Sequence, residues 1–150
     1  MLLNDNYIFL DVDVNTKEEM LEFIAKKAVE VGISTDEKKL LEDLLARENE
    51  VSTGLQDGFA IPHSRSTSIL EPSIMYFKTN KTLEWGSLDD SEVNCIFSLL
   101  VPAENENNMH MQMLSKLATC LIEEDFRDYV KNANDVQDIK NYLLKNMEVE

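Results

Sequence analysis

His63 is the side chain of this 150-residue chain whose type and setting best suit nucleophilic chemistry. Strand-like residues 59–61 lead into Pro62, which fixes its own φ angle and biases the preceding residue towards an extended backbone. We therefore expect the imidazole at the end of a strand, on a rigid turn. With an ordinary pKa of about 6.5 the ring is largely neutral at physiological pH, and the lone pair on its unprotonated nitrogen can attack an electrophile. The competing interpretation is an ordinary loop histidine at the surface.

Two further side chains could support such chemistry, although each also has a structural explanation. His110 opens an expected helix whose later turns are apolar, so it could equally be a polar N-terminal residue or a histidine satisfied at the edge of the core. Arg47 lies at the end of another expected helix, where a cation also interacts favourably with the helix dipole. Residue type alone leaves both interpretations open.

Sequence motifs of several other chemistries are missing. The chain has no GxxxxGK[ST] loop, no GxGxxG, no HExxH and no GxSxG, so bound ATP or NAD, a zinc-protease site and an α/β-hydrolase nucleophile have no support. Cys95 and Cys120 lie in apolar patterns without CxxC or histidine spacing. We interpret them as buried thiols in a reducing cytoplasm rather than as a disulfide or a metal site. The chemistry is therefore expected to centre on histidine or carboxylates, with no cofactor and no metal.

Alternating strands and helices must position these residues. Periodicity predicts strands at 7–14, 73–78, 81–85 and 93–101, the middle two as a candidate hairpin, and helices at 16–32, at 35 or 36 to about 48, and at 109–122, 125–131 and 135–145. Residues 51–75 hold two of the four glycines and two of the three prolines, and such irregular segments often carry sites. The order of elements predicts an α/β fold with a mixed, mainly parallel sheet of about five strands and helices on both faces, a three-layer sandwich.

Composition limits the partners. With 29 acidic and 14 basic side chains, the formal charge is -15, which excludes nucleic acid and anionic membrane surfaces as expected partners. We find no basic, apolar leader and no run near the roughly 18 apolar residues that span a bilayer, so we expect neither a targeting segment nor membrane insertion. Without a linker or repeat, residues 1–150 are expected to form a single domain.

Two motifs together resemble a known family. The first is RE-x(4)-TG-x(3)-G-x-AIPH, from Arg47 to His63, and the second is HMQMLSKLATCL, from His110 to Leu121. The chain resembles, over roughly residues 5–145, the enzyme IIA domain of the fructose/mannitol type in the phosphoenolpyruvate-dependent sugar phosphotransferase system (PTS). The departures are Met111, Ser64 and Gln56, none of which removes a proposed chemical group.

The resemblance implies a cytoplasmic phosphoryl carrier. His63 would accept a phosphoryl group from phospho-HPr through Nε2 and pass it to a cysteine of a sugar-specific enzyme IIB, which serves the membrane enzyme IIC. His110 would donate a hydrogen bond to the phosphoryl oxygens, and Arg47 would stabilise charge or support the site. Backbone N–H groups near Thr53, Gly54 or Ser64 could hold the equatorial oxygens.

Other functions remain open at this point. A regulatory, nitrogen-type IIA protein would be phosphorylated on the same histidine, and an inert or metal-binding acidic module is the plainest alternative. Enzyme IIB domains of such systems carry their cysteine in a short phosphate-cradling loop, and the sequence around Cys95 and Cys120 contains no such loop. We therefore expect a free-standing A component.

The charge is distributed unevenly along the chain. Residues 51–75 carry a net charge of only -1, from one base and two acids, whereas each flanking region carries -7. We expect the acidity to steer a basic-faced carrier while sparing the mouth of the site.

Overall fold

The computed structural model describes residues 2–104 and 109–147, with the backbone alone described at positions 109 and 110. The elements in chain order are η1 (Asp5–Tyr7), β1 (Ile8–Val12), α1 (Lys17–Glu30), α2 (Glu37–Glu50), β2 (Phe59–Ala60), β3 (His63–Ser66), β4 (Ser73–Leu83), β5 (Val93–Pro102), α3 (Met109–Ile122), α4 (Glu124–Asn132) and α5 (Val136–Met147). Within this part of the chain, no helix combines the length and apolar character needed to cross a bilayer.

The strands form one mixed sheet in the order β1, β4, β5, β2, with β3 also paired to β5. β1 is parallel to β4, and β2 and β3 are parallel to β5, whereas β4 and β5 run antiparallel. β2 and β3 therefore succeed one another along a single edge of the sheet. The prediction of a mixed, mainly parallel sheet of about five strands is confirmed.

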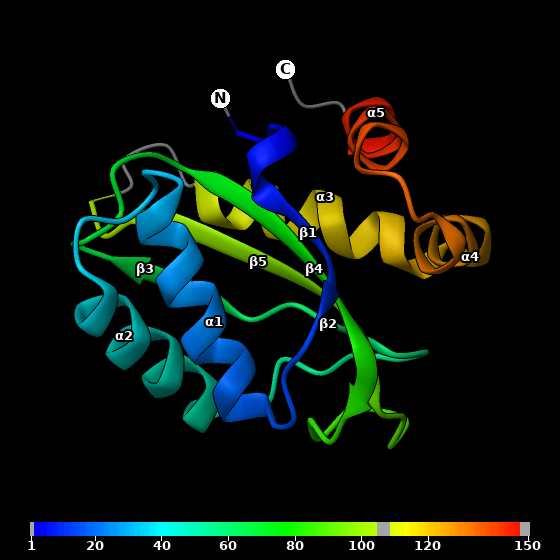
Figure 1. Cartoon of the computed structure of the whole chain (residues 1–150), viewed down its shortest axis with the longest axis horizontal. Helices are drawn as coiled ribbons and strands as arrows, with labels where there is room; N and C mark the ends of the chain where they lie inside the picture. Colours follow the sequence, from blue (N-terminus) through cyan, green and yellow to red (C-terminus); the bar gives the residue numbers. More distant parts are fainter. Residues whose placement is uncertain (1, 105–108, 148–150) are drawn as a thin grey trace.

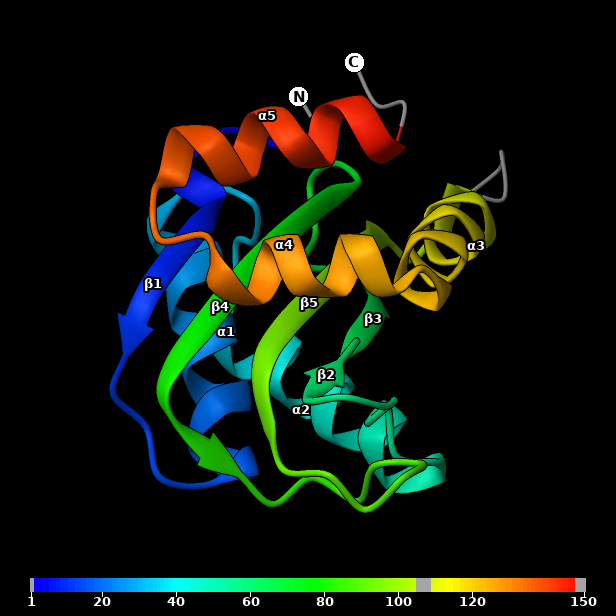
Figure 2. The ribbon, with the colours of Figure 1, turned by 90° about the vertical axis from the view of Figure 1, so that its right-hand side faces the viewer.

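Helices cover both faces of this sheet. Figure 1 shows α1 and α2 together on one face, and Figure 2, turned by 90°, shows α4 and α5 in front of the strands with α1 and α2 behind them. The predicted three-layer α/β arrangement is confirmed. The helix α2 runs beside β3, which is the contact that matters for His63.

Side-chain caps determine where the first two helices begin. The Thr16 hydroxyl accepts a hydrogen bond from the Glu19 N–H at 3.1 Å, and the Glu19 carboxylate accepts one from the Asn15 N–H at 2.9 Å. Asp36 caps α2 in the same way, accepting from the Lys39 N–H at 3.0 Å. These caps satisfy backbone donors that a helix start otherwise leaves unpaired. The T-x-x-E spacing of Thr16 and Glu19 predicts a capping box, and the structure confirms the cap, although the return bond reaches the N–H of Asn15, one residue further back than in that motif.

The central strands supply most of the core. Phe77 of β4 and Phe97 of β5 have no exposed surface, and Phe97 lies between Tyr76, with ring centroids 4.7 Å apart, and Phe59, at 6.3 Å. β5 is buried along almost its whole length, as its continuous apolar sequence predicted. A buried central strand of this kind gives the edge that carries His63 a rigid support.

The predicted hairpin around Thr79 and Asn80 is wrong. Residues 73–83 form the single strand β4, whose register with β5 shifts between Lys78 and Leu83. The Thr-Asn pair falls where the pairing is irregular: β1 pairs with β4 as far as Thr79, and the register with β5 resumes at Leu83, so the turn preference yields an irregularity within one strand instead of a chain reversal. The reversal of the chain instead occurs in residues 84–92.

Two smaller expectations about burial also need correction. The helical period of residues 109–122 predicts Ala118 on the inward face with Met113, Leu117 and Leu121, but Ala118 is exposed on α3 whereas the other three are buried. Cys95 is fully buried as predicted, but Cys120 is only half-buried and its thiol contacts the Asn146 carbonyl at 3.5 Å. The helical period placed residue 118 at the margin of the apolar stripe, where the orientation of α3 decides its exposure.

Candidate functional site

His63 is the first residue of β3, and not the last residue of a preceding strand as predicted. The short strand β2 ends at Ala60, Ile61 and Pro62 interrupt the pairing, and β3 resumes it with His63 opposite Leu99 of β5. Pro62 lacks an N–H donor, which explains the interruption. The Pro62 carbonyl still accepts the Leu99 N–H at 3.2 Å, so the residue before His63 remains bonded to β5.

Both ring nitrogens of His63 have defined partners. Nδ1 lies 2.7 Å from the Ile61 carbonyl oxygen, and Nε2 lies 3.0 Å from Nε of Arg47. A carbonyl can only accept, so Nδ1 carries the proton; the Arg47 Nε–H can only donate, so Nε2 presents its lone pair. The neutral ring is therefore held in the Nδ1–H tautomer with Nε2 as its basic atom.

The surroundings keep this ring neutral. His63 is only 6% exposed, and burial lowers its pKa below the ordinary value of 6.5. The positive charge of Arg47 lowers the pKa further, whereas the hydrogen bond to Ile61 and the negative charge of Glu48 raise it. Because burial is the largest of these effects, the Nε2 lone pair remains available below the pH at which an exposed histidine would be protonated.

Arg47 reaches the site from the last turn of α2. Its Nη1 donates to the Val51 carbonyl at 2.9 Å, which anchors the guanidinium at the point where the helix passes into the irregular segment. The two motif ends, 16 positions apart in the chain, are thus in direct contact. Arg47 therefore lies beside His63, its position near the C-terminus of α2 also suits a cation, and its role in the chemistry stays a prediction.

These groups border an open cavity of about 250 Å³. Its lining consists of Asp43, Ala46, Arg47, Glu50, His63, Ser64 and Arg65. The two carboxylates and two guanidiniums balance, so the mouth carries no net charge, but it is not free of acidic groups as the local sequence suggested. The acids come from α2, which lies outside residues 51–75.

The three expected phosphoryl-binding supports differ in their surroundings. Ser64 follows His63 in β3, is buried and lines the cavity. The Thr53 N–H and hydroxyl instead donate to the two oxygens of Glu48, each at 2.7 Å. The Gly54 N–H donates to the Ser52 hydroxyl at 3.2 Å. Both donors of Thr53 are therefore bonded to the last turn of α2, and the amide of Gly54 is bonded within the loop.

His110 lies in the first turn of α3, and its side chain is outside the described residues. The structure brings together His63, Arg47 and Ser64, while Thr53 and Gly54 belong to the loop behind them. The expectation that His110 borders the same site stays a prediction.

Sequence reasoning missed Glu48 and the carbonyl of Ile61. Glu48 is a buried carboxylate, which is rare, yet on a helical wheel it is only one more glutamate in an acidic helix. A carbonyl partner has no side-chain signal at all. The one available clue was the RE pair within the motif, since Glu48 follows Arg47 directly.

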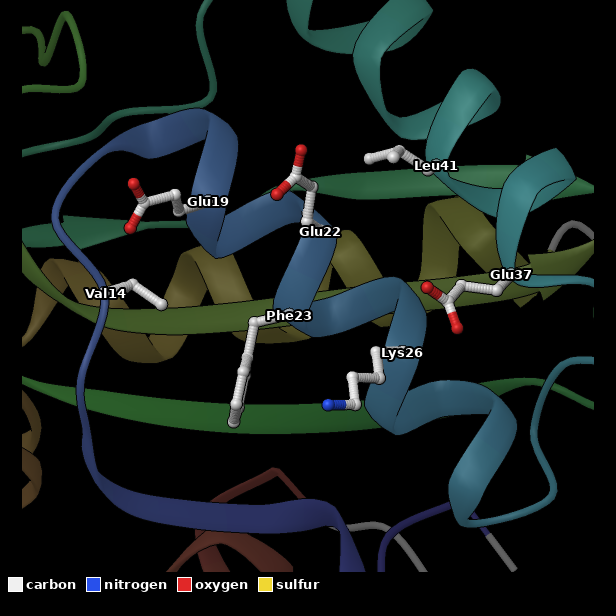
Figure 3. A pocket seen from close by; sticks show the side chains of 7 residues that line it. All are labelled: Val14, Glu19, Glu22, Phe23, Lys26, Glu37 and Leu41. Atoms are coloured by element: carbon white, nitrogen blue, oxygen red, sulfur yellow. The ribbon is translucent and has the colours of Figure 1, made fainter.

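A second, broader hollow of about 500 Å³ lies between α1 and α2. Figure 3 shows its lining side chains, which include Glu19, Glu22 and Phe23 from α1 and Glu37 and Leu41 from α2. Its lining contains no histidine, cysteine or serine, and within the described part of the chain no group of three or more His, Cys, Asp or Glu side chains could hold a metal ion. The histidine cavity is therefore the candidate active site.

The fold and the site together define an α/β domain built around a buried, neutral histidine with a guanidinium at its unprotonated nitrogen, Nε2. Residues 1–146 match the family model described as "Phosphoenolpyruvate-dependent sugar phosphotransferase system, EIIA 2". The chain belongs to this family, a phosphotransferase component of the PTS, and the prediction of the family is confirmed.

Named relatives agree with this assignment. The "PTS system fructose-specific EIIA component" of Haloferax volcanii is 31% identical over 141 residues, covering 94% of this chain and 91% of that protein. The fructose-specific EIIABC component of Bacillus subtilis is 30% identical and covers 88% of this chain, but the match spans only 21% of that longer protein.

Solved structures show the same fold. Nitrogen regulatory protein IIA-Ntr from Neisseria meningitidis superposes with a TM-score of 0.87 at 30% identity, covering 95% of this chain and 96% of that one. The structure of Escherichia coli enzyme IIAMTL in complex with phosphorylated enzyme IIBMTL gives 0.77 at 19% identity, covering 97% and 96%.

Proposed function

We propose that this protein is a phosphoryl carrier that accepts phosphate from phospho-HPr on Nε2 of His63 and donates it to the cysteine of an enzyme IIB. The observation that carries the proposal is the state of the His63 ring. Its proton is on Nδ1, bonded to the Ile61 carbonyl, and its lone pair is on Nε2 at a cavity lined by arginine. A neutral nucleophile with a guanidinium beside it suits transfer of a phosphoryl group, because the guanidinium can bind the phosphoryl oxygens.

The transfer step needs no proton movement at His63. The Nε2 lone pair forms the new N–P bond while the N–P bond of the donor breaks, and its electron pair returns to the donor histidine. The His63 ring becomes cationic, with its proton still on Nδ1 and bonded to the Ile61 carbonyl. That carbonyl stabilises the cationic phosphoimidazole, which remains a good leaving group for the next transfer.

Arg47 has to change partner during this step. In the free protein its Nε–H occupies the lone pair that must attack phosphorus. The guanidinium therefore leaves Nε2 and binds the incoming phosphoryl oxygens, for which its planar set of donors is well suited. The hydrogen bond from Nη1 to the Val51 carbonyl keeps the side chain close during the exchange.

The remaining predicted residues divide into two roles. Ser64 and His110 are proposed to bind the phosphoryl oxygens, Ser64 because it lines the cavity beside His63. Thr53 and Gly54 are proposed to hold the loop rather than the phosphate, because their donors already have partners. No metal or nucleotide takes part in this scheme.

Two uses of the carrier are proposed, in cytoplasmic sugar uptake or in regulation. A fructose-specific relative at 31% identity favours transport, in which enzyme IIB passes the phosphate onward to a sugar bound by the membrane enzyme IIC. A nitrogen regulatory IIA protein with a TM-score of 0.87 at 30% identity favours control of a partner through the phosphorylation state. Both uses load the same histidine.

Transfer of labelled phosphate tests the proposal. With labelled phosphoenolpyruvate, enzyme I and HPr, we expect the protein to acquire acid-labile phosphate and His63→Ala to acquire none. Labelling of His63→Ala to the wild-type level would show that another residue is the nucleophile. Presenting the phosphorylated protein to purified enzyme IIB proteins then separates transport, in which one accepts the phosphate rapidly, from regulation, in which none does.

A further inference from the structure

Glu48 is a buried acid immediately behind the proposed nucleophile. Its side chain is only 5% exposed, and its Oε2 forms an ion pair with Lys17 Nζ at 2.7 Å. Lys17 belongs to the start of α1, and its ammonium also donates to the Trp85 carbonyl at 3.0 Å and lies 5.3 Å from the centre of the Trp85 ring. A buried charge needs this many partners, because each unsatisfied lone pair in a low-dielectric setting is costly.

The same carboxylate holds Thr53 at two points. Oε2 accepts the Thr53 N–H and Oε1 accepts the Thr53 hydroxyl, both at 2.7 Å. The Thr53 Oγ1 in turn accepts the indole N–H of Trp85 at 3.2 Å. The two bonds from Thr53 to the carboxylate are charge-assisted and fix both the backbone and the side chain of this loop residue. An ion pair that only joined Lys17 of α1 to Glu48 of α2 would not require them.

Backbone hydrogen bonds continue from Thr53 to the histidine. The Ile61 N–H donates to the Thr53 carbonyl at 3.1 Å, and the Ile61 carbonyl accepts from Nδ1 of His63 at 2.7 Å. Ile61 is thus held at its N–H on one side and holds the imidazole on the other. A continuous series of hydrogen bonds joins Glu48 to His63 through Thr53 and Ile61.

Glu48 is also the chain neighbour of Arg47, which contacts the opposite nitrogen of the same ring. Movement of Glu48 would displace the end of α2 and the loop together. The two ring nitrogens are therefore oriented from a single place in the fold, one through Thr53 and Ile61 and the other through Arg47.

We propose that Glu48 is a positioning residue for phosphoryl transfer, whose carboxylate holds Thr53 and, through Ile61, keeps His63 in the Nδ1–H tautomer with Nε2 as nucleophile. The inference deepens the proposed function and rests on it for the kinetic consequence. The tautomer itself is a property of the free protein. Lys17 has a different role, because its ammonium stabilises the buried charge without contacting Thr53.

The experiment compares Glu48→Gln with Lys17→Met. Both break the ion pair and are expected to lower stability, but only Glu48→Gln alters the carboxylate that accepts the two Thr53 donors. Long-range ¹H–¹⁵N spectra of the imidazole, recorded well above its pKa, should show Nδ1–H in the wild type and Lys17→Met, and a mixture of tautomers in Glu48→Gln. The initial rate of phosphate acceptance from phospho-HPr should fall about tenfold in Glu48→Gln beyond the fall in Lys17→Met, equivalent to about 1.4 kcal/mol.

Two further variants keep the test decisive if Glu48→Gln fails to fold. Thr53→Val retains the ion pair and loses the hydroxyl bond, so it should show part of the tautomer shift, whereas Thr53→Ser keeps both donors and should restore the wild-type spectrum. Wild-type nitrogen shifts in every folded Glu48 and Thr53 variant would overturn the proposal. Failure of the wild type to take phosphate would contradict the proposed function instead, and would leave the tautomer result standing.

Discussion

The contact between Arg47 Nε and His63 Nε2 joins the two residues on which the chemistry depends. The sequence predicted both residues, but the contact itself could not be predicted. It requires the last turn of α2 to lie beside the first residue of β3, and that geometry comes from packing of elements across the sheet. The contact of the Ile61 carbonyl with Nδ1 of His63 could not be predicted either, because a main-chain acceptor is present at every residue whatever its type.

Replacement of Arg47 tests its proposed double role. Arg47→Gln should slow phosphate acceptance by about 10²-fold, the usual effect of removing one preorganised donor from a charged transition state. Arg47→Lys is the matched control, because it keeps the charge but loses the planar guanidinium, and its rate should lie in between. The measurement is the single-turnover rate with phospho-HPr. A wild-type rate in Arg47→Gln would assign the residue a structural role only.

The lowered pKa of His63 predicts the pH dependence of both activity and stability. Burial disfavours the charged ring in the folded state, so the rate of phosphate uptake should stay constant down to about pH 6.5 and fall only below it. For the same reason, the free energy of unfolding should be at its full value above the ordinary pKa. It should decline as the pH falls from there to the lowered folded pKa, because the unfolded chain binds the proton first.

Urea unfolding at a series of pH values, compared between wild type and His63→Gln, isolates this contribution from those of the carboxylates. The slope between about pH 6.5 and 5 should be smaller in the variant. Equal slopes in the two proteins would show that the folded and unfolded pKa values of His63 are the same.

At the scale of elements, the sequence predicted most helices and strands within a few residues, and failed where long-range pairing decides. The Thr79-Asn80 pair has turn character, yet β4 continues through it with a register shift, because the strand pairs with β5 both before it, at Lys78, and after it, at Leu83. Conversely, the strand expected to end at His63 is divided by Pro62, so that the histidine begins β3. Local preference cannot weigh ladder bonds contributed by distant segments.

The loop that holds Thr53 is closely packed, and this predicts a selective effect of Gly54→Ala. An added Cβ would lie 2.9 Å from Cα of Ser87, so the loop must shift, at a cost of about 1–3 kcal/mol. Displacement of the loop should also reduce phosphate uptake, because Thr53 and Ile61 orient His63. Stability is measured by urea unfolding and uptake by the transfer assay.

Gly32→Ala is the control for this prediction. Gly32 has a φ of +83° and no atom within 4 Å of the added Cβ, so its cost of about 1–2 kcal/mol comes from backbone strain alone. It lies at the end of α1, away from the loop, and should lose stability without losing uptake beyond that expected from the unfolded fraction. Equal losses of uptake in both variants would show that the packing of the Thr53 loop has no effect on phosphate uptake beyond its effect on stability.

At the scale of the whole molecule, a net charge of -15 surrounds a cavity whose own charged lining sums to zero. We expect association with a basic-faced HPr to be steered by this field. Raising ionic strength from 0.01 to 0.15 M shortens the screening length from about 30 to 8 Å and should slow association at least about tenfold. Stopped-flow association rates measure this, and a rate independent of salt would exclude steering.

Charge variants distinguish the field at the mouth from that of the whole surface. Asp43→Asn with Glu50→Gln removes two negative charges at the cavity, and Glu22→Gln with Glu37→Gln removes two at the hollow of Figure 3. Steering by the mouth predicts a larger fall in association rate for the first pair. Equal falls would mean that only the total charge matters.

The site of phosphate attachment tests the central claim most directly. The protein, with ¹⁵N-labelled histidine, is incubated with phospho-HPr, and the imidazole nitrogens of His63 are observed before and after. We predict that Nε2 becomes phosphorylated while Nδ1 keeps its proton, which remains hydrogen-bonded to the Ile61 carbonyl. Phosphate on Nδ1, phosphate on any other residue, or an unchanged His63 ring in the presence of active phospho-HPr would contradict the account.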